Sequence, residues 1–180
     1  MHDSFSTISS KDVIINPYWT YALDNYVMPS GRIGEYHYVK SRGSVFVIAR
    51  DANGNYLMTK QYRYLNRKYS IEFPGGGMLP GINPDDNARK ELAEELELAA
   101  NQLIFIGEFN PCNGMTDEIC SVYLAEDLHP IESEKDESEL IEPVTMTEKE
   151  INQAIRTNNI WDGMTLAAWA LYNNYKNIER

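Results

Sequence analysis

The sequence predicts an α+β or layered α/β/α domain, because segments with the pattern of strands are mixed with a few segments with the pattern of helices. The continuous apolar run at 44–49 is typical of a strand buried on both faces. Asn83-Pro84 is a strong helix start, and the segment at 165–172 is strongly helical. The chain has 180 residues, which suits one domain with a short arm.

The arm is expected at the N-terminus. This part of the chain is rich in aromatic residues, and Met28-Pro29-Ser30-Gly31 in its middle indicates a turn between two short strands. We therefore expect a β-hairpin arm over residues 1–40 and a main domain over residues 41–180.

A second hairpin is expected at the start of the main domain. Asp51-Ala52-Asn53-Gly54 predicts a tight turn after the strand at 44–49, because Asn-Gly supplies residues that tolerate positive φ. The segment at 56–62 then returns as the antiparallel partner of that strand.

A glycine-rich segment comes before the first helix. The three glycines at 75–77 predict a flexible loop that lasts until Asn83. The amide of Asn83 can cap a helix, Pro84 suits the first turn, and acidic residues follow, so the helix should run from Pro84 to about Leu96. Further elements are expected as strands at 103–109 and 119–124 and as helices at 148–158 and 165–172.

The charge balance restricts the kind of ligand. Acidic residues outnumber basic residues by 27 to 16, which gives a formal net charge of −11. This is the wrong sign for a protein that holds nucleic acid mainly by neutralising phosphate groups. An anionic substrate would have to meet a local basic cluster or a bound divalent metal.

The sequence predicts a cytoplasmic protein without membrane or nucleic-acid partners. No apolar run approaches the roughly 18 residues of a membrane-spanning helix. The first ten residues lack the apolar core of a secretory signal. Cys112 and Cys120 are too few for a disulfide scaffold and do not have the spacing of a zinc site, so we expect two free thiols.

Three carboxylates share one face of the predicted helix. Glu91, Glu94 and Glu95 are three and four residues apart, so their side chains emerge about 5–6 Å from one another. Such a cluster is either a solvated acidic face or a site for Mg²⁺ or Mn²⁺, which prefer oxygen ligands. The order of strand, glycine-rich loop and capped helix favours the metal site, because it would place the helix beside a sheet edge with its carboxylates lining a cleft.

Residues 76–98 resemble the Nudix box, G-x5-E-x7-R-E-U-x-E-E-x-G-U, in which U is aliphatic. The first glycine falls on Gly76, the inner motif on Lys90-Glu91-Leu92-Ala93-Glu94-Glu95, and the closing aliphatic residue on Leu98. The segments that flank the box resemble those of the branch that hydrolyses ADP-ribose and related nucleoside diphosphate sugars. These segments are 42–63, 71–77, 109–118 and 161–172. The resemblance implies a Nudix-like α/β/α sandwich with a mixed β-sheet and the N-terminal β-hairpin arm.

Three positions depart from the family pattern. Ile82 stands where the family has a glutamate, so one acidic contribution is missing. Lys90 replaces an arginine, which keeps the charge but loses the bidentate fork. Glu97 replaces the glycine that ends the helix. The backbone there is normally left-handed, a conformation that glycine adopts at the lowest energetic cost.

The resemblance implies a set of site residues. Glu91, Glu94 and Glu95 would bind the metals, and Glu91 and Glu95 would serve catalysis together with a late glutamate, for which Glu139 is the first choice and Glu137 the second. The segment 137–142 resembles the mobile acidic loop that carries this glutamate, although a solvated loop without a role is an equal alternative.

The resemblance also implies substrate contacts. Arg63 would approach a phosphate oxygen and Glu72 the nucleoside, with Gly76 close to the substrate. Tyr18, or its neighbours Trp19 and Tyr21, would stack on a base or pack in a subunit interface. The loop Met115-Thr116-Asp117-Glu118 would contact the distal sugar.

These features predict a metal-dependent pyrophosphohydrolase, with Mg²⁺ or Mn²⁺ as cofactor, that splits an ADP-ribose-like nucleoside diphosphate sugar into a nucleoside monophosphate and a sugar phosphate. Two alternatives remain open at this stage. One is hydrolysis of another nucleoside diphosphate derivative, and the other is a non-catalytic module that binds a nucleotide sugar. Proteins of this branch commonly pair as homodimers through their N-terminal strands.

Overall fold

The computed structural model describes residues 5–133 and 140–178. Contacts within the chain divide it into two compact units. Unit 1 comprises Met1–Gly43 and Asn110–Ile119, and unit 2 comprises Ser44–Phe109 and Cys120–Arg180.

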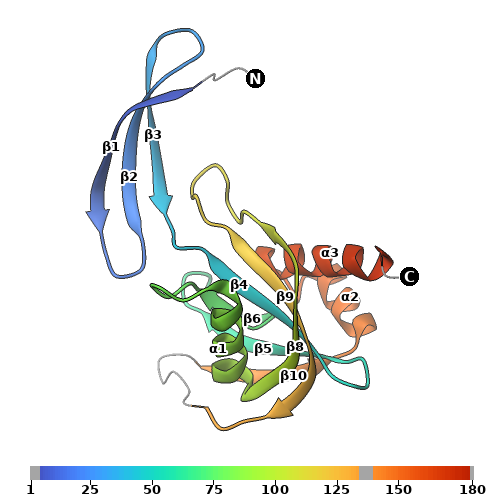
Figure 1. Cartoon of the computed structure of the whole chain (residues 1–180). Helices are drawn as coiled ribbons and strands as arrows, with labels where there is room; N and C mark the ends of the chain where they lie inside the picture. The colour runs from blue at the N-terminus through green and yellow to red at the C-terminus, as the bar shows by residue number, and fades with distance from the viewer. Residues whose placement is uncertain (1–4, 134–139, 179–180) are drawn as a thin grey trace. The chain divides into compact units, whose positions relative to one another are not determined.

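In the described residues, unit 1 is built on a three-stranded antiparallel sheet of order β1-β2-β3, which is blue in Figure 1. The strands are β1 (Ser6–Ile15), β2 (Thr20–Val27) and β3 (Ile33–Lys40). The amide of Met28 donates to the carbonyl of Arg32 at 2.8 Å, so the predicted hairpin is confirmed as β2 and β3. The sequence did not predict β1, because its residues are all exposed and two register shifts break their alternation.

Unit 2 contains a seven-stranded mixed sheet in the part of the chain that the structure describes. Its main path is β10-β5-β4-β9-β8, with β6 paired to β5 and β7 to β4. Strand β4 runs parallel to β9 and antiparallel to β5 and β7, which makes the sheet mixed. The bounds are β4 (Ser44–Arg50), β5 (Tyr56–Arg63), β6 (Lys68–Glu72), β7 (Gly75–Gly77), β8 (Leu98–Phe109), β9 (Cys120–Pro130) and β10 (Ile141–Met146).

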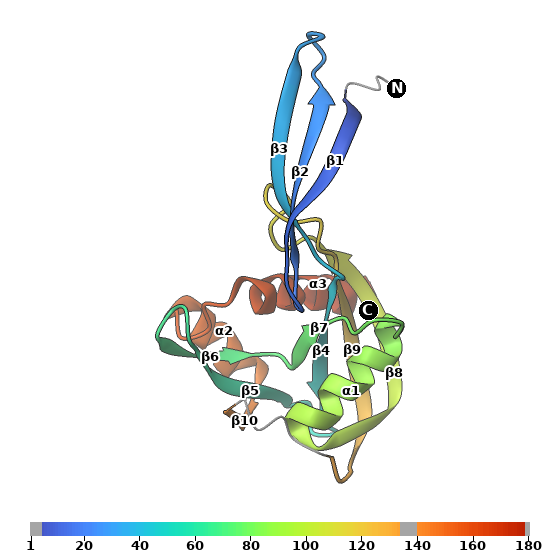
Figure 2. The same ribbon diagram turned by 90° about the vertical axis from the view of Figure 1, so that its left-hand side faces the viewer.

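Helices cover both faces of this sheet (Figure 2). Alternate residues of β4 belong to different cores, as expected for a strand buried on both faces. Val45 and Val47 pack in a cluster with Leu92 of α1 (Pro84–Leu96). Phe46 and Ile48 pack in the cluster that includes residues of α2 (Glu148–Arg156) and α3 (Gly163–Ile178). The α/β/α layering is therefore confirmed.

Several predicted elements are longer than the sequence indicated. Strand β8 begins at Leu98, with only Glu97 between it and α1, and β9 continues to Pro130. Helix α3 begins at Gly163 and ends at Ile178, whereas α1 has the predicted bounds. The tight turn after β4 is present, with Gly54 at φ 81°.

The prediction of a flexible loop at 75–77 was wrong. These glycines form β7, and Gly75 pairs with Phe46 of β4. A Cβ atom on Gly75 would lie 2.3 Å from the carbonyl oxygen of Val45, so only glycine allows this close pairing. Glycine composition indicated a loop because the partner strand lies far away in the sequence.

The prediction of a loop over 137–142 was wrong in its last part. Residues 134–139 lie outside the described residues, but Ile141 and Glu142 begin strand β10, which pairs with Gln61 and Lys60 of β5. The ammonium of Lys60 lies 3.1 Å from a carboxylate oxygen of Glu142.

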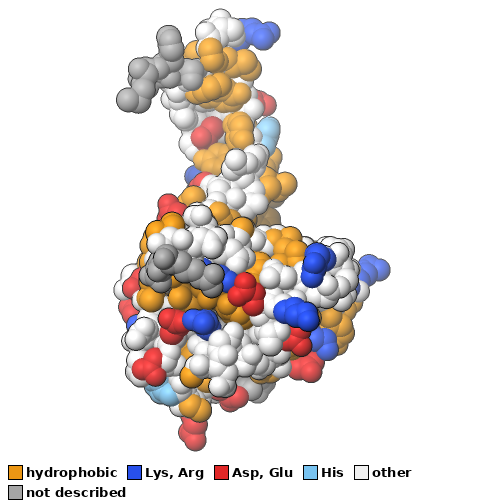
Figure 3. Space-filling model, turned by 90° about the vertical axis from the view of Figure 1, so that its right-hand side faces the viewer, with side chains coloured by type: hydrophobic (Ala, Val, Ile, Leu, Met, Phe, Trp, Pro, Cys, Tyr) orange, Lys and Arg blue, Asp and Glu red, His pale blue; other side chains and the backbone are white. Residues whose placement is uncertain are grey.

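Two further expectations can be compared with the described residues. Cys112 is exposed and Cys120 is buried, and neither forms a disulfide among these residues. Within the same part of the chain, no helix is both long and apolar enough to cross a bilayer. Figure 3 shows acidic and basic side chains interspersed over one face of unit 2.

Candidate active site

Helix α1 carries the predicted carboxylates and is fixed at its start by local signals. The side chain of Asn83 accepts a hydrogen bond of 2.9 Å from the amide of Asp86, and Pro84 lies in the first turn. The hydroxyl of Tyr123 on β9 donates to Asp85 at 2.7 Å, which ties the helix start to the sheet. The cap and this hydrogen bond fix the start of α1, and the buried Ala88, Leu92 and Leu96 determine which face turns toward the sheet.

The carboxylate of Glu91 lies against the backbone of β7. A Cβ atom on Gly76 would lie 2.7 Å from Oε2 of Glu91, so the missing side chain makes the space that the carboxylate fills. The fully buried amide Nδ2 of Asn87 lies 3.4 Å from Oε1 of Glu91 and 3.4 Å from the carbonyl of Gly77. Sequence reasoning missed Asn87, although its place one helical turn before Glu91 was a usable signal.

The other two carboxylates differ in their surroundings. Glu95 is buried, with 6% of its surface exposed. Glu94 forms an ion pair with Lys90 one turn earlier, and its side chain is 33% exposed. Arg89 donates to the carbonyl of Ala100 at 2.8 Å, so it does not replace the family's arginine.

The donor set suits a divalent metal, although the side chains do not converge on one point. Glu91, Glu94 and Glu95 offer carboxylate oxygens from one helix face, the ligands that Mg²⁺ and Mn²⁺ prefer. In the described residues, no group of three or more histidine, cysteine or acidic side chains is arranged to hold a metal ion. Glu94 is turned toward Lys90 in this conformation. Its oxygens would have to exchange that partner for a metal.

The end of α1 has a left-handed residue at the position where the family pattern has a glycine. Glu97 has φ 56° and ψ 40°, in the left-handed region, and its amide donates to the carbonyl of Ala93 at 2.9 Å. This conformation costs a non-glycine residue about 1 kcal/mol. Ile82, at the other departure, is half-buried, and its amide lies 3.4 Å from the carbonyl of Leu79.

Arg63 and Glu72 form an ion pair across β5 and β6. The guanidinium donates from Nε to Oε1 of Glu72 at 2.7 Å and from Nη2 to Oε2. Glu72 is 1% exposed, whereas the side chain of Arg63 is 41% exposed. The hydrogen bond with Glu72 raises the pKa of Arg63, and the charges of Asp162 and Glu95 raise it further. The structure therefore places Arg63 in direct contact with Glu72, and the charges of Asp162 and Glu95 also act on its guanidinium.

Asp162 also acts on Arg63 through its charge. Its Oδ2 accepts a 2.7 Å hydrogen bond from the amide of Thr165, so it caps α3. Burial raises the pKa of Asp162, and the charge of Glu72 raises it too, while Thr165 and Arg63 act in the opposite direction. The sequence showed Asp162 only as the lead-in to a helix, because its neighbours on β5 and β6 are distant in the chain.

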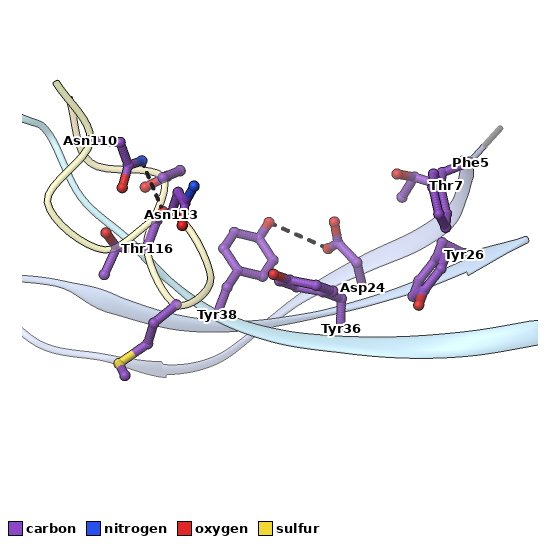
Figure 4. Close-up of a pocket in the computed structure, with 11 residues that line it drawn as sticks. Phe5, Thr7, Asp24, Tyr26, Tyr36, Tyr38, Asn110, Asn113 and Thr116 are labelled. Atoms are coloured by element: carbon purple, nitrogen blue, oxygen red, sulfur yellow. Dashed lines mark hydrogen bonds between the residues drawn. The ribbon is translucent and has the colours of Figure 1, made fainter. Parts of the chain in front are cut away.

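Unit 1 contains the other predicted substrate contacts that the structure describes. A pocket of about 770 Å³ lies on its sheet and is lined by Phe5, Thr7, Asp24, Tyr26, Tyr36, Tyr38, Asn110, Asn113, Met115, Thr116 and Asp117 (Figure 4). Tyr36 donates to the carbonyl of Gly114 at 3.2 Å, and Tyr38 donates to Asp24 at 3.4 Å. None of the described lining residues is basic, which suits an uncharged ring better than a phosphate.

The predicted stacking residue does not line this pocket. Tyr18 is 83% exposed, and Trp19 is 45% exposed. Tyr21 stacks on His37, with ring centroids 6.0 Å apart, and its hydroxyl lies 2.7 Å from Nδ1 of that histidine. Of the predicted sugar loop, Met115, Thr116 and Asp117 line the pocket. Glu137 and Glu139 lie outside the described residues.

Known proteins resemble this chain in sequence. The family model of the NUDIX domain matches residues 40–167. The chain is similar to the ADP-ribose pyrophosphatase of Bacillus subtilis, with 29% identity over 164 residues, 90% of this chain and 89% of that protein. It is also similar to the ADP-ribose pyrophosphatase of Mycobacterium tuberculosis, with 34% identity over 72% of this chain and 63% of that protein.

A solved structure supports the same fold. The crystal structure of an ADP compounds hydrolase matches with a TM-score of 0.85, covering 98% of this chain and 96% of that chain at 17% sequence identity. The family match includes β5, β6, helix α1 and the start of α3, which carry Arg63 and the residues around it. The chain therefore belongs to the Nudix family of hydrolases.

Proposed function

We propose that this Nudix hydrolase cleaves the pyrophosphate bond of a nucleoside diphosphate sugar of the ADP-ribose type. Water adds to one phosphorus, the bridging P–O bond breaks, and a nucleoside monophosphate and a sugar phosphate leave with release of a proton. Two similar proteins are named ADP-ribose pyrophosphatases. Their names support this substrate class.

The observation that carries the proposal is the two-pronged ion pair of Arg63 with the buried carboxylate of Glu72. The charge of Glu95 on α1 also raises the pKa of Arg63, which supports a guanidinium that acts together with the carboxylate helix. The guanidinium has five N–H donors, of which Glu72 receives two, and planar forks of this kind suit phosphate oxygens. Glu72 fixes the orientation of that fork, because its own carboxylate is buried.

Glu91, Glu94 and Glu95 are the proposed metal-holding residues, and Mg²⁺ or Mn²⁺ is the proposed ion. When bound, the ion supplies positive charge to the diphosphate and makes a water molecule more acidic. Gly76 keeps space for the Glu91 carboxylate, and Lys90 holds Glu94 until that carboxylate changes partner. We propose Glu139 as the base, with Glu137 as the second choice.

We also propose that the arm at 1–40 pairs two copies of the chain. Apolar side chains gather on the described surface of unit 1, where they are exposed by 42% to 83%; among them are Ile8, Val13, Ile14, Ile15, Tyr18 and Ile33. Figure 3 shows such side chains on this unit. Apolar surface of this kind is typical of an interface.

A substrate panel tests the proposed activity. The chain is incubated with Mg²⁺ and with ADP-ribose, other nucleoside diphosphate sugars, dinucleoside polyphosphates and coenzyme diphosphates, and a phosphatase then releases phosphate from the monoester products. We expect the highest kcat/KM with a nucleoside diphosphate sugar. Turnover of only the other two groups would overturn the substrate class. Tight binding of one sugar nucleotide without turnover of any compound would identify a binding module.

A further inference from the structure

The segment between α2 and α3 is attached to strand β6 through the side chain of Trp161. The indole Nε1 donates a hydrogen bond of 3.0 Å to the backbone carbonyl of Tyr69. The ammonium of Lys68 lies 3.8 Å from the centroid of the indole ring, which is a cation–π contact. Trp161 thus holds two successive residues of β6 by two different interactions.

Both of these residues lie opposite the end of β5 that carries Arg63. The strand register pairs Lys68 with Arg63 and Tyr69 with Tyr62. Strand β6 ends at Glu72, whose carboxylate receives both hydrogen bonds from Arg63. A displacement of β6 along β5 would therefore turn the guanidinium or separate it from its carboxylate.

The tip of the hairpin formed by β5 and β6 is exposed, so its position depends on the contacts that other segments make with β6. Tyr64 and Leu65 are 83% and 92% exposed, and Arg67 adopts a φ of 53° in the turn. In the described sheet β6 pairs with β5 alone, and segments with few buried contacts open first. Contacts at the base of the hairpin therefore decide how firmly β6 lies against β5.

We propose that Trp161 is a positioning residue for Arg63. Its indole fixes β6 against β5 and so keeps the guanidinium on Glu72, in one orientation toward the substrate. The inference rests on the proposed role of Arg63 in binding the diphosphate. The adjacent Asp162 supports it, because this carboxyl caps α3 and its charge also acts on Arg63.

Steady-state kinetics with ADP-ribose tests the proposal. We expect Trp161→Leu to raise KM roughly tenfold and to change kcat less than about twofold, the pattern of lost positioning in the ground state. Trp161→Phe keeps a ring beneath Lys68 but loses the N–H donor, so KM should rise only about threefold. Tyr64→Leu, on the exposed tip, is the matched control and should leave KM unchanged.

A double-mutant cycle distinguishes positioning from a general structural role. In an Arg63→Ala chain, Trp161→Leu should raise KM by less than about twofold, because the two residues act through one interaction. An equal factor with and without Arg63 would overturn the proposal. If Trp161→Leu does not fold, the cycle is run with Trp161→Phe.

Hydrogen exchange of the Arg63 Nε–H group gives a readout that does not need turnover. NMR of the full chain, with the signal assigned by loss in Arg63→Lys, should show exchange at least about tenfold faster in Trp161→Leu, because the ion pair opens more often. Unchanged exchange would contradict the positioning role. If the unsubstituted chain turns over no substrate, the proposed function fails, while this measurement still decides the role of Trp161.

Discussion

Gly76 and Glu91 share one space, because a Cβ atom on Gly76 would lie 2.7 Å from Oε2 of Glu91. That oxygen is at the end of a flexible side chain, so it can move aside. We therefore expect Gly76→Ala to leave the free energy of unfolding within about 1 kcal/mol, yet to lower Mg²⁺-dependent turnover roughly 10- to 100-fold. Urea unfolding and a magnesium titration of turnover measure the two effects.

The neighbouring glycines are matched controls. A Cβ atom on Gly75 would meet the backbone oxygen of Val45 at 2.3 Å, so Gly75→Ala should destabilise the fold by roughly 1–3 kcal/mol. No described atom lies within 4 Å of a Cβ atom on Gly77, so Gly77→Ala should change neither property. Equal loss of turnover in the Gly76 and Gly77 variants would contradict this account.

Glu95 should be required for metal-dependent turnover. Glu95→Gln keeps the shape of the buried side chain but removes its charge, so we expect turnover to fall at least about 100-fold. Glu94→Gln should also abolish turnover, while its fold stays intact. Glu97→Gln, on the exposed end of the same helix, makes the same chemical change and should keep activity. Full activity of both the Glu94→Gln and the Glu95→Gln variants would remove the metal site from α1.

Replacing Glu97 with glycine should stabilise the fold. Its φ of 56° is unfavourable for a side chain with a Cβ atom, whereas glycine adopts it freely. We expect Glu97→Gly to raise the free energy of unfolding by up to about 1 kcal/mol. Glu97→Ala keeps the Cβ atom and should not gain this stability. Urea unfolding of both variants separates the conformational effect from the loss of charge.

The stability of the fold should depend on pH through Asp162. Burial raises its pKa above the ordinary value of 3.8, so the folded state binds the proton more tightly than the unfolded state. This contribution is present below the unfolded pKa and is lost as pH rises through the folded pKa. Asp162→Asn keeps a capping side chain, so it should gain stability relative to the parent at neutral pH and lose that gain toward pH 4.

A parallel set of unfolding curves at several pH values measures the difference between Asp162→Asn and the parent chain. The difference should rise with pH between the ordinary and the raised pKa. A difference that is constant over this range would show that Asp162 binds its proton equally in both states.

The arm should pair two chains in solution. Light scattering after size-exclusion chromatography should give twice the 20.6 kDa mass of one chain. Ile14 is 54% exposed on β1, and Ile14→Lys should shift the protein toward the single-chain mass. Leu65→Lys places the same charge on the 92% exposed hairpin tip of unit 2 and should leave the mass unchanged. A single-chain mass for the parent would refute pairing.

The sequence predicted elements that are specified locally. The start of helix α1 was correct because Asn83 and Pro84 specify it within a few residues. The prediction of strand β4 was correct because a continuous apolar run indicates a strand buried on both faces, whatever its partner strands are. Strands β1 and β7 were missed because exposed residues and glycines take strand structure only through their neighbours.

The candidate site was predictable in its parts but not in its connections. The helical spacing of Glu91 and Glu95 follows from the sequence, and their family role follows from the resemblance. The pairing of Arg63 with Glu72 depends on the register of β5 and β6, and the place of Asp162 depends on the packing of α3. Such long-range arrangements cannot be read from local pattern.

Unit 1 is assembled from two separate stretches of chain, which limits how it can be manipulated. Residue Val39 bridges to Thr116, and the amide of Ser41 donates to Asp117 at 2.7 Å. Deleting the first 43 residues would remove these partners, and with them the backbone hydrogen bonds of Val39 to Met115 and Asp117, from the 110–119 stretch. A shortened enzyme, or a graft of the arm onto another scaffold, should therefore keep or remove residues 1–43 and 110–119 together.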